Sequence, residues 1–141
     1  MNQYIELRRR WQQDFAALPI KYALSQEDLA KGMAEWGLEP TDTDKIIRTG
    51  AGAFYRKEDV PRLTEIRQRH EQELKDAIAA DTTGDGFIFQ MFYRELADHE
   101  FGFTMEYDET LAALGLTWEQ VQADQRLSHG LKKAAHMFGV E

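Results

Sequence analysis

Apolar side chains recur at every third or fourth position along most of this chain, which is the spacing of amphipathic helices. The helix ends carry suitable residues, with Ser25 as an N-cap, Gly37 just past a C-terminus, and Thr117 with Gln120 at the spacing of a capping box. The connecting loops are short, so we expect a mainly α fold, a compact bundle of about six to eight helices. The pattern predicts helices over residues 2–18, 25–36, 42–47, 59–80, 87–101, 108–114, 117–123 and 125–138.

One stretch breaks the helical pattern. Residues 49–57 contain Gly50 and Gly52 and then the run Ala53–Arg56, which is typical of a turn that leads into an extended segment. We therefore expect a short β-hairpin near residues 49–57. Asp59 can cap the helix that follows, with Pro61 in its first turn, where a missing N–H costs little.

The composition is globular and indicates one domain over residues 1–141, with 43% hydrophobic and 30% charged residues. There is no cysteine, which excludes disulfides and thiolate metal ligands and favours a cytoplasmic location. The apolar runs are too short for a membrane span, and the first residues lack the apolar core of a signal peptide. The oligomeric state does not follow from any of these patterns.

Charge is distributed unevenly along a chain whose formal net charge is -8. Residues 45–63 hold five basic and two acidic residues, whereas residues 25–44 hold six acids and one Lys, and residues 81–111 hold eight acids and one Arg. The basic segment also combines glycines with adjacent aromatic residues, as contact sites do. Three interpretations of this segment are open. It contacts a protein, or it contacts a DNA duplex, or its aromatic residues belong to the core and its charges are only solvated. The candidate partner-binding residues are Arg48, Gly50, Gly52, Phe54, Tyr55, Arg56 and Lys57.

Two places offer weak candidates for metal ligands. Asp81 and Asp85 stand at the first and fifth positions of a loop that begins like an EF-hand, but its twelfth position is Phe92 instead of a bidentate Glu. We interpret this loop as a tight turn that uses Gly84 and Gly86 for positive φ and Asp85 for local capping. Glu95 and His99 are four residues apart on one helix and could hold a metal or act as an acid–base pair. A helix surface with His99 near its C-terminus is the simpler interpretation, so we predict no metal and no cofactor.

Catalytic signatures are missing from the sequence. It has no phosphate-binding Gly-x-x-x-x-Gly-Lys loop, no dinucleotide fingerprint, no His-Glu-x-x-His pair and no nucleophile elbow around Ser25 or Ser128. We therefore expect a protein that is not an enzyme.

Part of the basic segment resembles a known DNA-binding element. The run from Gly50 to Val60, with a glycine turn, an aromatic pair, Arg and then an acidic pair, is similar to the wing and following helix of MerR- and excisionase-type winged-helix domains. The resemblance implies a helix-turn-helix formed by residues 25–36 and 42–48, with Arg48, Arg56 and Lys57 on phosphates. The acids of residues 25–44 oppose that arrangement.

A second resemblance extends over most of the chain. The order of Tyr22–Gln26, Gly32-Met33, Gly37-Leu38, residues 41–46, Gly50–Phe54, Glu95-Leu96 and His99-Glu100 resembles a small uncharacterised domain family of Gram-positive bacteria and their prophages and mobile elements. This context implies an interaction protein, and anti-CRISPR proteins are examples of small acidic proteins that antagonise host defence. We thus expect a non-enzymatic domain that inhibits or regulates a nucleic-acid-directed host complex by binding a protein. A winged-helix-like DNA-binding regulator and a metal-dependent activity at Glu95 and His99 are the alternatives.

Overall fold

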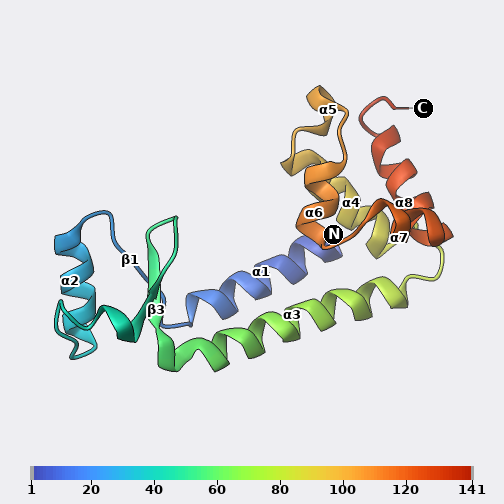
Figure 1. The fold of residues 1–141 in the computed structure, drawn as a ribbon. Coiled ribbons are helices and arrows are strands. Elements are labelled where there is room, and N and C mark those ends of the chain that lie inside the picture. Colours follow the sequence, from blue (N-terminus) through green and yellow to red (C-terminus); the bar gives the residue numbers. More distant parts are fainter. Residues whose placement is uncertain (1, 141) are drawn as a thin grey trace. The chain divides into compact units, whose positions relative to one another are not determined.

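The computed structural model describes residues 2–140, and over this range the fold is mainly α, as predicted. Eight α-helices accompany one small antiparallel sheet in the described part of the chain (Figure 1). The helices are α1 (Gln3–Ala16), α2 (Gln26–Glu35), α3 (Val60–Ala80), α4 (Phe87–Asp98), α5 (Phe101–Thr104), α6 (Asp108–Leu114), α7 (Trp118–Ala123) and α8 (Gln125–His136). The strands are β1 (Lys21–Tyr22), β2 (Ile46–Arg48) and β3 (Ala53–Arg56), and two 3₁₀ turns are η1 (Thr43–Lys45) and η2 (Lys57–Asp59).

The chain divides into two compact units. Unit 1 takes the chain up to Trp11 and from Gln72 onward, and unit 2 is Gln12–Glu71. The prediction of a single domain over residues 1–141 stays a prediction. None of the helices within residues 2–140 combines the length and the apolar character that crossing a membrane requires.

Unit 2 is built around a three-stranded antiparallel sheet in the order β1–β3–β2. Its core consists of Leu29 and Met33 from α2, Ile46 from β2 and Phe54 from β3. Trp36 meets the Phe54 ring edge to face, with 5.5 Å between the ring centroids. At Gly32 an added Cβ would lie 2.5 Å from Phe54 Cζ, so the glycine lets the aromatic ring rest against α2.

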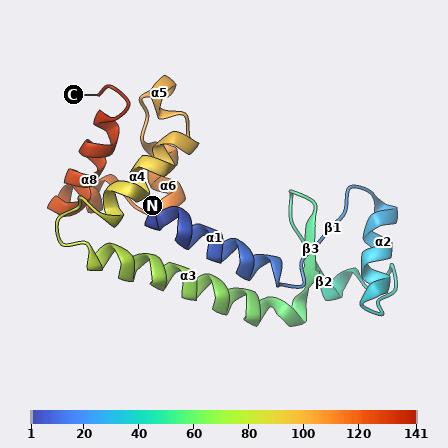
Figure 2. The same ribbon diagram turned by 180° about the vertical axis from the view of Figure 1, so that it is seen from behind.

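The predicted hairpin is present, and β2 and β3 pair over residues 46–56 (Figures 1 and 2). The helix predicted over residues 42–47 is wrong. Only the turn η1 forms there, and the chain then extends into β2. Ile46 and Ile47 are β-branched and fit a paired strand, where Ile46 also reaches the core.

Unit 1 has its core where α4 packs against α8. The buried residues of α4 are Phe87, Ile88, Met91, Phe92, Glu95 and Leu96, and those of α8 are Leu127, Gly130, Leu131, Ala134 and Ala135. Apolar side chains of α1, α6 and α7 complete this core, among them Tyr4, Leu111 and Val121.

The helix ends follow the local sequence where capping residues are present. Ser25 Oγ accepts a hydrogen bond from the Asp28 N–H, and Thr117 and Gln120 form the predicted capping box. Gly37 follows α2 with a φ of 75°. One helix was not predicted. The short helix α5 (Phe101–Thr104) occupies the stretch that follows the helix predicted over residues 87–101, where we expected the chain to be non-helical up to residue 107.

Replacing Gly130 with Ala should destabilise the protein by about 1–3 kcal/mol. An added Cβ would lie 2.5 Å from Ile88 Cγ2 and 2.9 Å from the Gly84 carbonyl oxygen. This overlap outweighs the better helix propensity of Ala. The free energy of unfolding, measured with urea and far-UV circular dichroism, reports the loss.

Gly102→Ala is the matched control, because its added Cβ would meet only the Phe138 ring, at 3.8 Å. This variant should unfold like the wild type. Equal stability of the two variants would contradict a close approach of α4 and α8 at Gly130.

Candidate functional site

The turn between β2 and β3 has a defined geometry. The Thr49 N–H donates to the Ala53 carbonyl at 2.8 Å, and Gly52 adopts a φ of 85°. The Ala23 N–H donates to the Gly52 carbonyl at 2.9 Å, which ties the turn to the segment after β1. At Gly52 a side chain would also meet the Ala23 oxygen, whereas Gly50 faces open space. Gly52 is therefore required by the turn, and Gly50 is not sterically required.

Alternation along β3 separates its two aromatic residues. Phe54 is 1% exposed and belongs to the core of unit 2, so it is not a surface anchor. Tyr55 is half-buried and projects from the opposite face of the sheet, because successive side chains alternate in a strand. The alternative that the aromatics are core residues thus holds for Phe54.

Two of the basic residues are close to acids of the same unit. Arg56 contacts Glu58 at 2.9 Å and Asp59 at 2.8 Å, and its guanidinium carbon lies 5.3 Å from the centre of the Trp36 ring. Lys45 lies 3.6 Å from Asp42. These charges are largely balanced, so they offer less to a partner than the sequence indicates.

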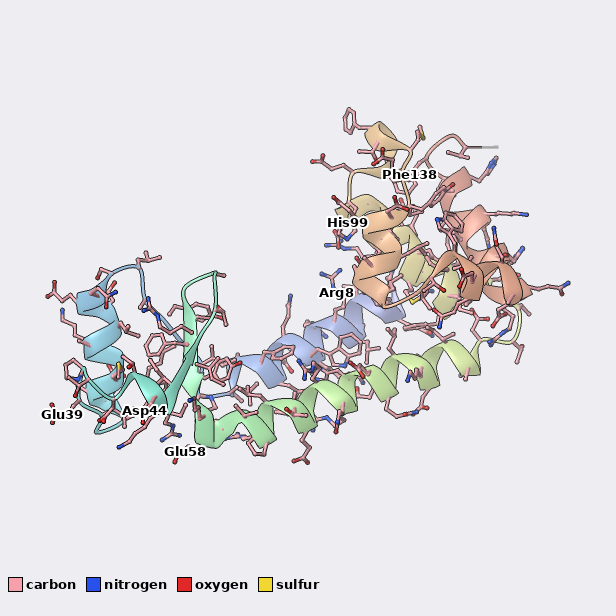
Figure 3. The ribbon with its side chains drawn as sticks, in the orientation of Figure 1. Arg8, Glu39, Asp44, Glu58, His99 and Phe138 are labelled. Carbon is pink, nitrogen blue, oxygen red and sulfur yellow. The ribbon has the colours of Figure 1, made fainter. Side chains whose placement is uncertain are left out.

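Arg48 and Lys57 differ from these residues. Both are exposed, and neither forms an ion pair within the described residues. Figure 3 places Glu39, Asp44 and Glu58 at the end of unit 2 away from the β2–β3 turn. Arg48 ends β2 at that turn, whereas Lys57 follows β3 and is next to Glu58 in the chain.

Two apolar residues beside the turn were missed by the sequence analysis. Tyr22 is 72% exposed and Leu24 is 95% exposed. Tyr22 pairs with Ala53 across β1 and β3, which places it next to the turn. One signal in the sequence could have found them. Tyr22 and Leu24 lie between Pro19 and Ser25 and belong to no helical pattern of apolar positions. We call Tyr22, Leu24, Arg48 and Gly50–Gly52 the hairpin surface.

A hollow of about 320 Å³ lies near the other end of the hairpin. Trp36 and Leu38 form the apolar part of its lining, and acidic and basic residues form the rest. The charged residues that line it are Asp44, Lys45, Arg56, Lys57 and Glu58.

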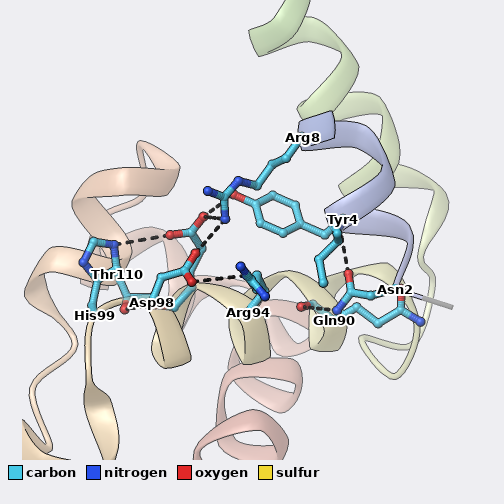
Figure 4. A network of polar contacts seen from close by, with 10 residues as sticks. Asn2, Tyr4, Arg8, Gln90, Arg94, Asp98, His99 and Thr110 are labelled. Carbon is cyan, nitrogen blue, oxygen red and sulfur yellow. Dashed lines mark hydrogen bonds and ion pairs between the residues drawn. The ribbon is translucent and has the colours of Figure 1, made fainter. Parts of the chain in front are cut away.

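The predicted pair Glu95 and His99 belongs to a polar network in unit 1 (Figure 4). Tyr4 Oη donates to Glu95 Oε1, and Arg8 Nη1 lies 3.3 Å from the same oxygen. His99 Nε2 lies 3.3 Å from Glu95 Oε2, and Arg8 also binds Asp98 at 2.7 Å. Burial and the neighbouring Glu95 carboxylate raise the pKa of Tyr4, which stays protonated and keeps donating.

This network binds α1 to α4 through groups that a metal would need. Both Glu95 oxygens already have partners, and Glu95 is buried. Within residues 2–140 no group of three acidic or histidine side chains is arranged to hold a metal ion. Glu95 and His99 therefore belong to a group of side chains that joins α1 to α4.

Asp81 organises the loop that begins like an EF-hand. Its carboxylate accepts backbone N–H groups of Thr83, Gly84, Gly86 and Ile88 at 2.9–3.2 Å. Gly84 has the predicted positive φ, but Gly86 does not. The capping carboxylate is that of Asp81 and not that of Asp85, so this part of the prediction is wrong.

Asp85 points to α8 instead. Its Oδ1 contacts His129 at 2.7 Å and Lys133 at 3.1 Å, which lowers the pKa of its carboxyl. The two aspartates therefore bind different groups and do not form the two ends of a calcium site.

The chain belongs to the DUF7659 family, a family of unknown function, whose model matches residues 3–137. This agrees with the resemblance to an uncharacterised small domain family. No curated protein and no solved structure matches the chain.

Replacing Glu95 with Gln should lower the free energy of unfolding by about 1–3 kcal/mol, because Arg8 and His99 lose a charged acceptor in a buried place. Urea unfolding measures this change, and Asp98→Asn, at a more exposed site, should cost less. Added Zn²⁺ should leave the melting temperature of the wild type unchanged. A Zn²⁺-dependent rise that disappears in Glu95→Gln would instead support the metal alternative.

Replacing Asp81 with Asn should destabilise the loop by about 1–3 kcal/mol at neutral pH, because one carboxylate oxygen is lost as an acceptor. Burial alone would raise the pKa of the Asp81 carboxyl, but N–H groups of Ile88, Gly84, Thr83 and Gly86 hold it below its ordinary value. The wild-type contribution is therefore present above the ordinary pKa and disappears as the pH falls through the lowered one.

The stability difference between wild type and Asp81→Asn should thus shrink below about pH 4. Asp85→Asn is the control and should change stability less at neutral pH. A difference that stays constant down to pH 2 would show that the Asp81 charge is not involved.

Proposed function

We propose that this chain is a non-enzymatic protein-interaction domain of bacterial or mobile-element origin that binds its partner through the hairpin surface. One observation carries the proposal: Tyr22 and Leu24 are exposed on the β1 side of the hairpin, and Arg48, on β2 at the other side of β3, is exposed and has no ion pair within residues 2–140. Aromatic and Arg residues are the side chains that most often dominate binding energy at interfaces.

The rigidity of the turn supports this role. The hydrogen bond from Ala23 to Gly52 and the positive φ of Gly52 hold the turn before any partner arrives. A preorganised surface loses less conformational entropy on association. Tyr22 can therefore act as an anchor at low entropic cost.

The partner that we propose is a component of a nucleic-acid-directed host complex, which the chain would inhibit or regulate, as anti-defence proteins do. This proposal is supported by the resemblance of the sequence to a small uncharacterised domain family of Gram-positive bacteria and their prophages and mobile elements, and by the net charge of -8. An acidic protein can compete with nucleic acid for basic protein surfaces.

A DNA-binding regulator is the second candidate, and the strand order favours it. The elements α1, β1, α2, β2 and β3 occur in this order, and β1 lies beside β3, as in winged-helix domains. A recognition helix for the major groove would follow α2. At that place the described residues form only the turn η1, which follows Asp42 and contains Asp44, so we place this candidate second.

The hairpin surface is tested by affinity purification from a bacterial host lysate with Arg48→Glu and with Leu24→Ala. Both variants should lose a stoichiometric partner that the wild type retains, because the first reverses the unpaired charge and the second removes the most exposed apolar side chain of the surface. Lys75→Glu, an exposed site on α3 with the same change of charge, is the control and should retain the partner.

Recovery of no stoichiometric partner by the wild type would count against the proposal. A gel-shift titration at low salt separates the two candidates, because phosphate contacts predict binding that weakens with salt and with Arg48→Ala or Lys57→Ala. A flat titration would end the DNA-binding candidate.

A further inference from the structure

Helix α5 in unit 1 presents one aromatic side chain to solvent. Phe103 is 91% exposed, whereas Phe101, two residues earlier, is 1% exposed. Two residues along a helix point to nearly opposite sides, so one side of this short helix is buried and the other carries Phe103. Phe101 packs against Tyr107 and Phe138, with ring centroids 4.7 and 5.9 Å apart. These contacts hold α5 on the unit and leave Phe103 outside.

The backbone on both sides of α5 is held in an uncommon conformation. Glu100 and Met105 both have a φ of 55°, the left-handed region that favours glycine. Each such residue costs about 1 kcal/mol or more. Backbone strain of this kind persists where the surrounding structure maintains it, and it is concentrated at functional sites.

Backbone hydrogen bonds keep this segment ordered. The N–H groups of Phe103 and Thr104 donate to the Glu100 carbonyl at 2.9 and 3.2 Å, and the Met105 N–H donates to the Phe101 carbonyl at 2.9 Å. Thr104 Oγ1 accepts from the Glu106 N–H at 3.2 Å. Phe103 is thus displayed on a fixed segment, which we call the α5 loop (Glu100–Glu106).

The α5 loop and the start of α6 carry negative charge. Residues 100–109 contain four acids and neither Lys nor Arg. Glu100, Glu106 and Asp108 are exposed and form no ion pair within the described part of the chain, whereas Glu109 lies 3.4 Å from His99. Met105 is a further exposed apolar side chain beside Phe103.

We infer that the α5 loop docks onto a basic protein segment, with Phe103 packing against its apolar side chains and the acids next to Phe103 facing its Arg or Lys side chains. Complementary charge selects this occupant, because a nucleic acid or an anionic membrane would be repelled by Glu100, Glu106 and Asp108. A single buried aromatic anchor with a charged rim is the usual arrangement of an interface hot spot. This site lies in unit 1 and does not rest on the hairpin surface.

The experiment uses the full chain and two short fluorescent peptides, one with alternating Leu and Arg and one with alternating Leu and Asp. Fluorescence anisotropy should show saturable binding of the Arg peptide and none of the Asp peptide. Phe103→Ala should weaken binding of the Arg peptide about tenfold or more, because it removes the anchor. This variant keeps every charge, so it separates docking from general attraction between an acidic protein and a basic peptide.

Three further variants complete the test. Glu106→Gln with Asp108→Asn should weaken binding and reduce its dependence on salt. Leu24→Ala and Arg48→Glu alter the hairpin surface and should leave peptide binding unchanged, so failure here and failure of the proposed function are distinguishable. Circular dichroism should show that Phe103→Ala is folded, as expected for a side chain that is 91% exposed.

The inference is overturned if the Arg peptide does not saturate, or if Phe103→Ala binds it as tightly as the wild type. Equal binding of the Asp peptide would overturn it as well. Loss of peptide binding in Arg48→Glu with full binding in Phe103→Ala would assign the contact to the hairpin surface instead.

Discussion

The close packing of α4 against α8 is the constraint on which unit 1 depends. Gly130 lets the two helices approach, since any larger residue would meet Ile88 and the Gly84 carbonyl. Six residues of α4 are buried in unit 1, and Glu95 is one of them. A buried carboxylate needs partners, and Tyr4, Arg8 and His99 provide them. Glu95 lies two turns after Ile88 on the same face of α4, so its contacts with Tyr4 and Arg8 bind α1 beside this core.

Two acids of unit 1 that the sequence offers as metal ligands, Asp81 and Glu95, likewise take part in structural contacts. Asp81 satisfies backbone N–H groups before α4, a place where an uncapped helix start would leave donors without partners. Glu95 serves side-chain donors within the core. Both acids therefore form contacts that hold the fold together. The two surfaces that result differ in sign, with Arg48 at the hairpin surface and Glu100 and Glu106 at the α5 loop.

In unit 2 the β-hairpin determines where each charged and aromatic side chain of the basic segment lies. Residues that are adjacent in sequence separate in space, because Arg56 and Lys45 stay among the acids while β2 places Arg48 at the turn. Alternation in β3 sends Phe54 into the core and leaves Tyr55 on the other face. Tyr22 and Leu24 reach the turn only through the pairing of β1 with β3. A sheet of three short strands therefore determines which of these side chains are exposed.

The sequence by itself determined the mainly α class, most helix positions, the caps at Ser25 and Thr117 and the presence of a hairpin, because these depend on local spacing and local hydrogen bonds. It did not determine that residues 46–48 form a strand, since an apolar pair suits a short helix as well until a pairing partner is known. The exposure of Phe103 and the burial of Phe54 were equally beyond it, because both are Phe residues within two positions of a glycine and differ in what packs against them. Tertiary structure decided which charges are balanced and which remain for a partner, since ion pairs and burial join residues that are far apart in the chain.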